Sequence, residues 1–170
     1  MTYRPRDHRS GLSVAPSQGN GPDTAHAADR RGEGGRRQSI SLSAESLRSP
    51  ATARHYTSNH LGKWGVPGDQ IAIVEHIVSE LVTNAVRHSR GRSFRLIVTI
   101  TAGRAVVTVL DSGRYQSFAP RVADLDEEGG RGLALVEALA DEWGHYPHRG
   151  INAVYAAVRL PAQREEGTTC

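Results

Sequence analysis

Cysteine is almost absent from this sequence. Its 170 residues include one Cys, and that is the last residue, Cys170. An intramolecular disulfide is therefore excluded, and nothing favours an oxidising compartment. Long hydrophobic runs are lacking as well: no stretch approaches the roughly 18–20 apolar residues that span a bilayer, and the start lacks the apolar centre of a secretion signal. We therefore expect a cytoplasmic protein that does not bind a membrane.

Lysine and aromatic residues are also scarce, which bears on nucleic-acid binding. Lys63 is the only Lys among 21 basic residues, and aromatic residues make up 5% of the chain. Residues 1–38 hold seven Arg and four acidic residues, which leaves 14 basic and 14 acidic residues in the remainder. The remainder is therefore neutral, and aromatic residues do not alternate with Arg as single-strand binding requires. We expect no direct nucleic-acid partner.

Composition divides the chain into one domain and two tails. Residues 1–38 are rich in Gly, Ser, Pro, Ala and Arg and show no hydrophobic period, so we expect a disordered tail. From Ser39, apolar and polar residues alternate as in a half-buried strand. The length suits one domain with a core, which we place at 39–161, followed by a polar tail at 162–170.

The order of the predicted elements indicates the fold class. After the first strand, a helix is expected from about Pro50. A second, strongly amphipathic helix is expected to be capped by Asp69 and to end before Gly91, with an apolar face made of Ile71, Val74, Val78, Leu81 and Ala85. SFRLIVTIT and RAVVTVLD then form a hairpin around Ala102 and Gly103. A long irregular stretch, a further helix (GRGLALVEALADEW) and two strands complete the pattern. Helices combined with mainly antiparallel strands predict a two-layer α/β sandwich with a mixed, mostly antiparallel sheet.

Three segments have polar features that a packed domain does not need. In the first, ELVTNAVRHS, the helical period places Glu80, Asn84 and His88 on one ridge with Arg87 beside it. Asn is a poor helix former, so the presence of Asn84 inside a helix needs an explanation. Taken alone, the ridge is compatible with a solvated helix face that carries weak i, i+4 pairs.

The second and third segments are VVTVLDSG and EEGGRGLALVEAL. Asp111 ends an apolar strand just before Gly113, so a carboxylate could face a ligand there, although a plain Asx turn has the same pattern. Glycines around Arg131 precede a helix whose free N–H groups could bind an anion, although a flexible helix entry explains them too. Together, the three segments favour a nucleotide site.

These segments, in this order, resemble the N, G1 and G2 boxes of the GHKL ATPase superfamily, also called histidine-kinase-like ATPases. The similarity is closer to the stand-alone anti-sigma-factor serine kinases and related ATP-binding regulators. It implies the GHKL α/β sandwich, ATP and Mg²⁺ as cofactors, and the loop 112–130 as an ATP lid. It also implies a sigma factor, an anti-anti-sigma protein or both as partners, and it leaves a homodimer open.

The resemblance assigns a role to each residue of the three boxes. Glu80 is implied as the general base and Asn84 as the Mg²⁺ ligand. Asp111 is implied to recognise adenine. The remaining residues implied to contact the nucleotide are Arg87, His88, Gly113, Gly130, Arg131, Gly132 and Leu133.

Two functional classes follow from this comparison. The first is an ATP-dependent protein-serine kinase that acts on an anti-anti-sigma partner and holds a sigma factor inactive; Glu80 favours it. The second is a non-catalytic, nucleotide-dependent binding module. It is favoured by the shortened adenine box, which is the G1 box around Asp111 and Gly113, because Tyr115 stands where the longer form has Gly. A detached histidine-kinase catalytic domain is disfavoured, because residues 1–38 show no helical pattern.

Overall fold

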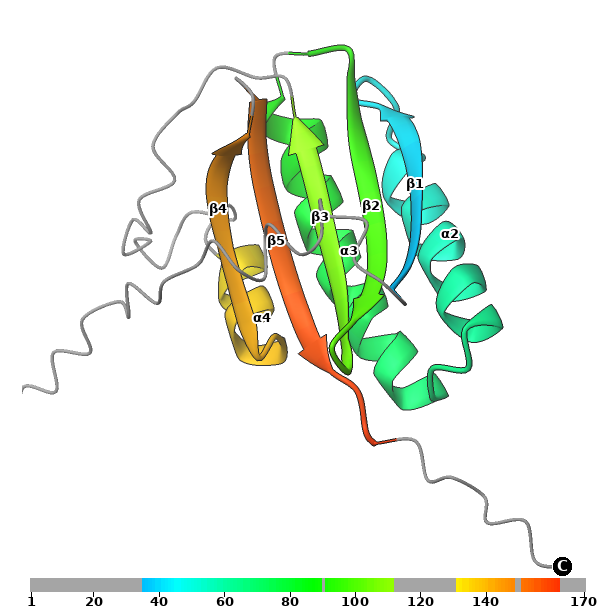
Figure 1. The fold of residues 1–170 in the computed structure, drawn as a ribbon. Coiled ribbons are helices and arrows are strands. Elements are labelled where there is room, and N and C mark those ends of the chain that lie inside the picture. The colour runs from blue at the N-terminus through cyan, green and yellow to red at the C-terminus, as the bar shows by residue number, and fades with distance from the viewer. Residues whose placement is uncertain (1–34, 90, 112–130, 149–150, 163–170) are drawn as a thin grey trace, which may run out of the picture.

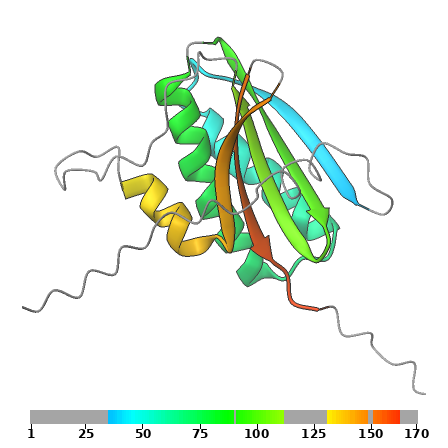
Figure 2. The same ribbon diagram turned by 60° about the vertical axis from the view of Figure 1, so that its left-hand side comes forward.

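One antiparallel sheet with helices on one face makes up the described part of the chain (Figures 1 and 2). The structure, a computed structural model, describes residues 35–89, 91–111, 131–148 and 151–162. The strand order is β1-β2-β3-β5-β4, and every neighbouring pair is antiparallel. The predicted two-layer α/β sandwich is confirmed. The elements are β1 (Arg36–Ser43), α2 (Ser49–Lys63), α3 (Gly68–His88), β2 (Ser93–Thr101), β3 (Arg104–Asp111), α4 (Arg131–Leu139), β4 (Glu142–His148) and β5 (Ile151–Arg159).

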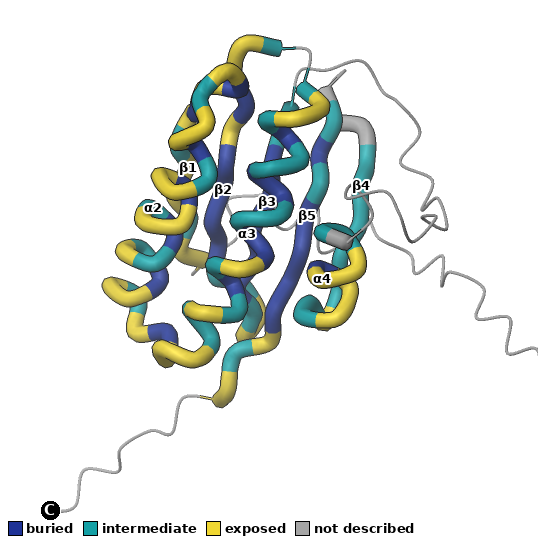
Figure 3. The backbone as a smooth tube through the Cα atoms, turned by 180° about the vertical axis from the view of Figure 1, so that it is seen from behind, coloured by how far each residue is buried: buried dark blue, intermediate teal, exposed yellow. Residues whose placement is uncertain are grey.

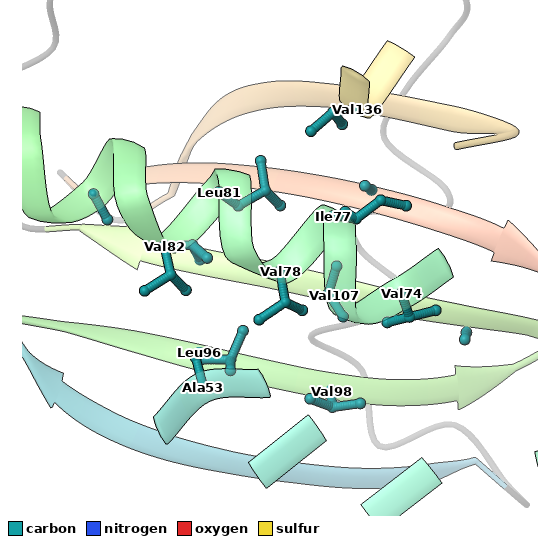
Figure 4. Close-up of a cluster of buried hydrophobic side chains, with 14 of the residues drawn as sticks. Ala53, Val74, Ile77, Val78, Leu81, Val82, Leu96, Val98, Val107 and Val136 are labelled. Atoms are coloured by element: carbon teal, nitrogen blue, oxygen red, sulfur yellow. The ribbon is translucent and has the colours of Figure 1, made fainter. Parts of the chain in front are cut away.

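Helix α3 lies over the centre of the sheet and forms most of the core. Its buried residues follow the helical period that the sequence shows, and they are Val74, Ile77, Val78, Leu81, Val82 and Ala85. They pack against Leu96 and Val98 of β2 and Val107 of β3, while Val136 brings α4 to the same cluster (Figure 4). The central strands β2, β3 and β5 are the most continuously buried (Figure 3). None of the helices in the described ranges is long and apolar enough to cross a membrane.

The hairpin between β2 and β3 confirms the turn predicted from sequence. Ala102 and Gly103 have φ values of 48° and 69°, so both central residues are left-handed, as a type I′ turn requires. This turn matches the right-handed twist of the strands that it joins. It fixes a register in which Thr101 lies opposite Arg104 and Phe94 opposite Asp111.

Two element starts differ from the sequence patterns. Strand β1 begins at Arg36, three residues before Ser39, because backbone pairing with β2 continues from Gln38–Val98 to Arg36–Ile100 beyond the apolar alternation. Helix α3 begins at Gly68 after Pro67 and has no side-chain N-cap. Asp69 therefore lies in the first turn, where its charge complements the helix dipole, and it does not cap the helix as predicted.

The sheet face away from the helices carries a hydrogen-bonded cluster around Tyr155. Val154 and Ala156 belong to the core beneath the helices, so Tyr155 points to the opposite face. Its hydroxyl donates to Glu142 Oε1 at 3.0 Å, and Glu142 Oε2 pairs with Arg104 at 2.9 Å. Burial, followed by the contact with Glu142, raises the pKa of Tyr155 to about 12.

This raised pKa predicts a loss of stability in alkali. The folded state keeps the Tyr155 proton up to about pH 12, whereas an unfolded chain loses it near pH 10. The contribution of Tyr155 is thus complete below about pH 10 and disappears as the pH rises toward 12. Urea unfolding at intervals from pH 7 to 12 should give a shallower alkaline decline for Tyr155→Phe than for the wild type. Equal slopes would contradict the assignment.

Candidate functional site

The polar ridge predicted from sequence lies on the C-terminal half of α3. Glu80 and Asn84 are half-buried one turn apart, and Arg87 and His88 are exposed at the end of the helix. From Glu80 to His88 the helix rises about 12 Å, since each residue adds about 1.5 Å. The half-buried members are thus held by the helix and its neighbours, while Arg87 and His88 face solvent.

The start of α4 lies directly against Glu80. Helices α3 and α4 pack side by side (Figure 3). A Cβ atom placed on Gly132 would lie 3.4 Å from Cδ of Glu80 and would collide with Oε2 of the same carboxylate. The absence of a side chain at Gly132 therefore allows the Glu80 carboxylate to approach the first turn of α4. In that turn the backbone N–H groups have no partner within the helix, so the local potential is positive.

Asp111 lies at the end of β3, where its backbone is held between two strands. It stands opposite Phe94 of β2 and Asn152 of β5 in the sheet register. The side chain is half-buried, and its Oδ1 accepts a hydrogen bond of 2.5 Å from the Ser89 hydroxyl. Ser89 directly follows His88, the last residue of α3, so this bond joins the end of β3 to the helix of the polar ridge.

The fold thus brings the three predicted segments together through two contacts. Glu80 meets Gly132 across the α3–α4 interface, and Ser89 at the end of α3 meets Asp111. Arg131 is the first residue of α4, and Leu133 in its first turn is half-buried. The other predicted residues, Gly113, Gly130 and the lid 112–130, lie outside the described residues.

The predicted metal ligand fits magnesium by its chemistry. The side-chain oxygen of Asn84 is a hard, neutral donor of the kind that Mg²⁺ accepts alongside waters and nucleotide phosphates. In the ranges that the structure describes, no group of three or more His, Cys, Asp and Glu residues could hold a metal ion. Asn84 is half-buried on α3, one turn beyond the carboxylate of Glu80.

Ser89 is the site residue that the sequence analysis did not assign. It is the last residue of ELVTNAVRHS, and its type is common at helix ends, so the sequence gives it no special signal. Its partner Asp111 is 22 residues away in the chain. The pairing of β2, which begins shortly after Ser89, with β3, which ends at Asp111, brings the two residues near each other.

Comparison with known families identifies the domain. The family model described as "histidine kinase-like ATPase domain" matches residues 43–160. The chain belongs to this family. Histidine kinase-like ATPase domains bind ATP, generally with Mg²⁺. The match begins at the end of β1 and extends to the residue after β5, so it contains all three segments of the site. A search of curated protein sequences found no significant match.

Solved structures that are similar to this chain include two bacterial proteins. The crystal structure of the RsbU and RsbW domains of Rv1364c from Mycobacterium tuberculosis is 25% identical with a TM-score of 0.57. The match covers 74% of this chain and 32% of that one, so this protein spans about a third of its neighbour. The histidine kinase domain of a blue-light-activated histidine kinase from Erythrobacter litoralis is 26% identical over 55% of this chain and 46% of its own, with a TM-score of 0.43.

Proposed function

We propose that this protein binds Mg²⁺ and ATP and is an anti-sigma factor with serine kinase activity toward an anti-anti-sigma partner. The observation that carries the proposal is the position of Glu80. Its carboxylate lies against the first turn of α4, and Asn84 follows one turn later on the same ridge of α3. A carboxylate so placed, close to the helix end proposed to hold phosphates, is suited to accept a proton during phosphoryl transfer.

In the proposed reaction, the serine hydroxyl of the partner attacks the γ-phosphorus of ATP. A new bond forms between the serine oxygen and phosphorus, the bond from phosphorus to the β,γ-bridging oxygen breaks, and ADP leaves. Glu80 accepts the serine proton. Bound Mg²⁺ would supply neutralisation of phosphate charge, and Asn84 would hold it. Since phosphoryl transfer depends mainly on positioning, the fixed spacing of Glu80 and Asn84 on one helix is expected to matter most.

The nucleotide would lie across the three segments. Asp111 is proposed to accept a hydrogen bond from the adenine amino group, and Gly113 to allow close approach of the base. The start of α4, with Gly130, Arg131, Gly132 and Leu133, is proposed to hold the phosphates, because free N–H groups at a helix start bind anions. Arg87 and His88, exposed at the end of α3, are proposed to lie near the phosphates.

The proposed partners rest on the similarity to the RsbW domain. The structure of that neighbour contains an RsbW domain together with an RsbU domain. We propose that this protein likewise takes part in partner switching in the cytoplasm, with a sigma factor and an anti-anti-sigma protein as alternative partners. Homodimerisation is compatible with this proposal.

A second candidate function is a nucleotide-dependent binding module without turnover. One observation favours it: Tyr115 stands where the longer form of the adenine box has a second glycine. A module of this kind would report its nucleotide state to a protein partner, and it would need no general base at Glu80. The two candidates therefore differ in what a substitution at Glu80 should do. The kinase should lose phosphoryl transfer, whereas the binding module should be unchanged.

Calorimetric titration of ATP into the full-length protein tests ATP binding, which both candidate functions require. With Mg²⁺ present, we expect saturable binding in the micromolar to millimolar range, and an excess of chelator should weaken it at least several-fold. GTP under the same conditions serves as the control for base recognition. Absence of heat with millimolar ATP and Mg²⁺ would overturn the proposed function.

A further inference from the structure

Ser89 makes an unusual set of contacts at the end of α3. Its backbone leaves the helical conformation, with φ −63° and ψ 134°, and its N–H still donates to Ala85 O at 2.8 Å. The side-chain oxygen lies 2.5 Å from Asp111 Oδ1 and 3.2 Å from Gly91 O, and the Gly91 N–H donates to it at 3.1 Å. The hydroxyl is thus surrounded by two acceptors and one donor.

The distances decide where the hydroxyl proton points. A serine has one proton to donate. The 2.5 Å contact with the Asp111 carboxylate is in the range of charge-assisted bonds, whereas the 3.2 Å contact with the Gly91 carbonyl is long for an O–H donor. The proton therefore points to Asp111. The resulting chain runs from the Gly91 N–H through the Ser89 hydroxyl to the carboxylate, and each bond polarises the next.

Asp111 is consequently held at both its backbone and its side chain. Strands β2 and β5 flank the backbone, and Ser89 binds one carboxylate oxygen, so rotation of the half-buried carboxylate is restricted. Ser89 also follows directly on the helix that carries Asn84 and Glu80. The end of α3 thus links the proposed metal ligand, Asn84, to the proposed base-recognition group, Asp111.

We infer that Ser89 is a positioning residue for nucleotide-base recognition: it orients the Asp111 carboxylate toward the 6-amino group of adenine. This inference rests on the proposed ATP site and adds to it a residue that makes the site selective. A carboxylate turned away from the base would lose the contact that distinguishes adenine, which presents an N–H donor at position 6, from guanine, which presents an acceptor there. Ser89 acts through Asp111 and is not a catalytic residue.

The test combines a change in the protein with a change in the ligand. Ser89→Ala should weaken binding of Mg²⁺ and ATP about 10-fold, the usual effect of losing one hydrogen bond to a charged group. For purine riboside triphosphate, which lacks the 6-amino group, the same substitution should change affinity less than about 2-fold. Ser89→Thr keeps the hydroxyl and should restore ATP affinity to within about 3-fold of the wild type.

Ser58→Ala is the matched control, because Ser58 lies on α2 and its hydroxyl bonds only to carbonyls of its own helix in the described contacts. Thermal melting of each variant shows whether the fold is kept. Equal weakening of both nucleotides by Ser89→Ala, or unchanged ATP binding, would overturn the inference while the ATP site stands. A wild-type protein that binds neither nucleotide would overturn the proposed function and this inference together.

Discussion

Glu80→Gln is expected to slow phosphorylation of a serine-containing partner by about 10²–10⁴-fold, the usual contribution of a general base. The substitution keeps the shape of the side chain beside Gly132 and removes only its capacity to accept the proton. Affinity for ATP should stay the same or rise, because a negative charge near the phosphates is removed. Single-turnover transfer of labelled phosphate from ATP to an anti-anti-sigma protein from the same genome measures the rate, and calorimetry measures the affinity.

Glu75→Gln provides the matched control for this prediction. Glu75 is also a half-buried glutamate of α3, but five residues from Glu80 places it on a different face of the helix. Its variant should transfer phosphate like the wild type. If Glu80→Gln transfers phosphate as fast as Glu75→Gln, then Glu80 is not the base. A wild-type protein that binds ATP but transfers no phosphate to any candidate partner would favour the non-catalytic binding module.

Asn84→Ala is expected to remove most of the Mg²⁺-dependent part of ATP affinity, about a 10–100-fold loss when magnesium is present. Binding with chelator present should change little. The substitution is favourable for a helix interior, because Ala is a better helix former than Asn. The folded state should therefore be retained, so a loss of binding could not be ascribed to unfolding. ATP titrations with magnesium and with chelator, performed on both proteins, measure the effect.

The matched control is Asn59→Ala on α2. Asn59 is exposed, and its amide contacts the ring of His55 at 2.9 Å on its own helix. The chemical change is the same, and only its place in the fold differs. Affinity and magnesium dependence should both remain at wild-type values in this variant. Full magnesium dependence in Asn84→Ala would show that another group holds the ion.

Local sequence determined the elements and their buried faces. The helical period of α3 predicted an apolar face on which Val74, Val78, Leu81 and Ala85 are buried in the structure and Ile71 is partly buried. The pair Ala102–Gly103 predicted the β2–β3 hairpin. Both signals are local, because helix periodicity and turn geometry depend on residues a few positions apart. The start of α3 was predicted less well, because the chain enters the helix at Pro67 and Gly68 without using Asp69 as a cap.

The sequence also determined the family, since the ordered boxes agree with a family match over residues 43–160. It determined which residues could form a site: a poor helix former at Asn84, an acid at a strand end and glycines before a helix. Roles for these residues followed from the resemblance. The sequence did not determine distances, because a motif specifies residue types and order but not how separate segments pack.

The tertiary structure alone decided which of these residues meet. It placed β5 between β3 and β4, so Asp111 pairs with Asn152 of β5 and not with a residue of β4. Packing of α4 on α3 put Gly132 against Glu80, and the end of α3 put the Ser89 hydroxyl on Asp111. Such contacts form when elements that are distant in the sequence bury their apolar faces against one another. The position of each element is therefore fixed only when all of them are assembled. The sequence supplied the chemical groups, and the packing of helices on the sheet supplied their arrangement.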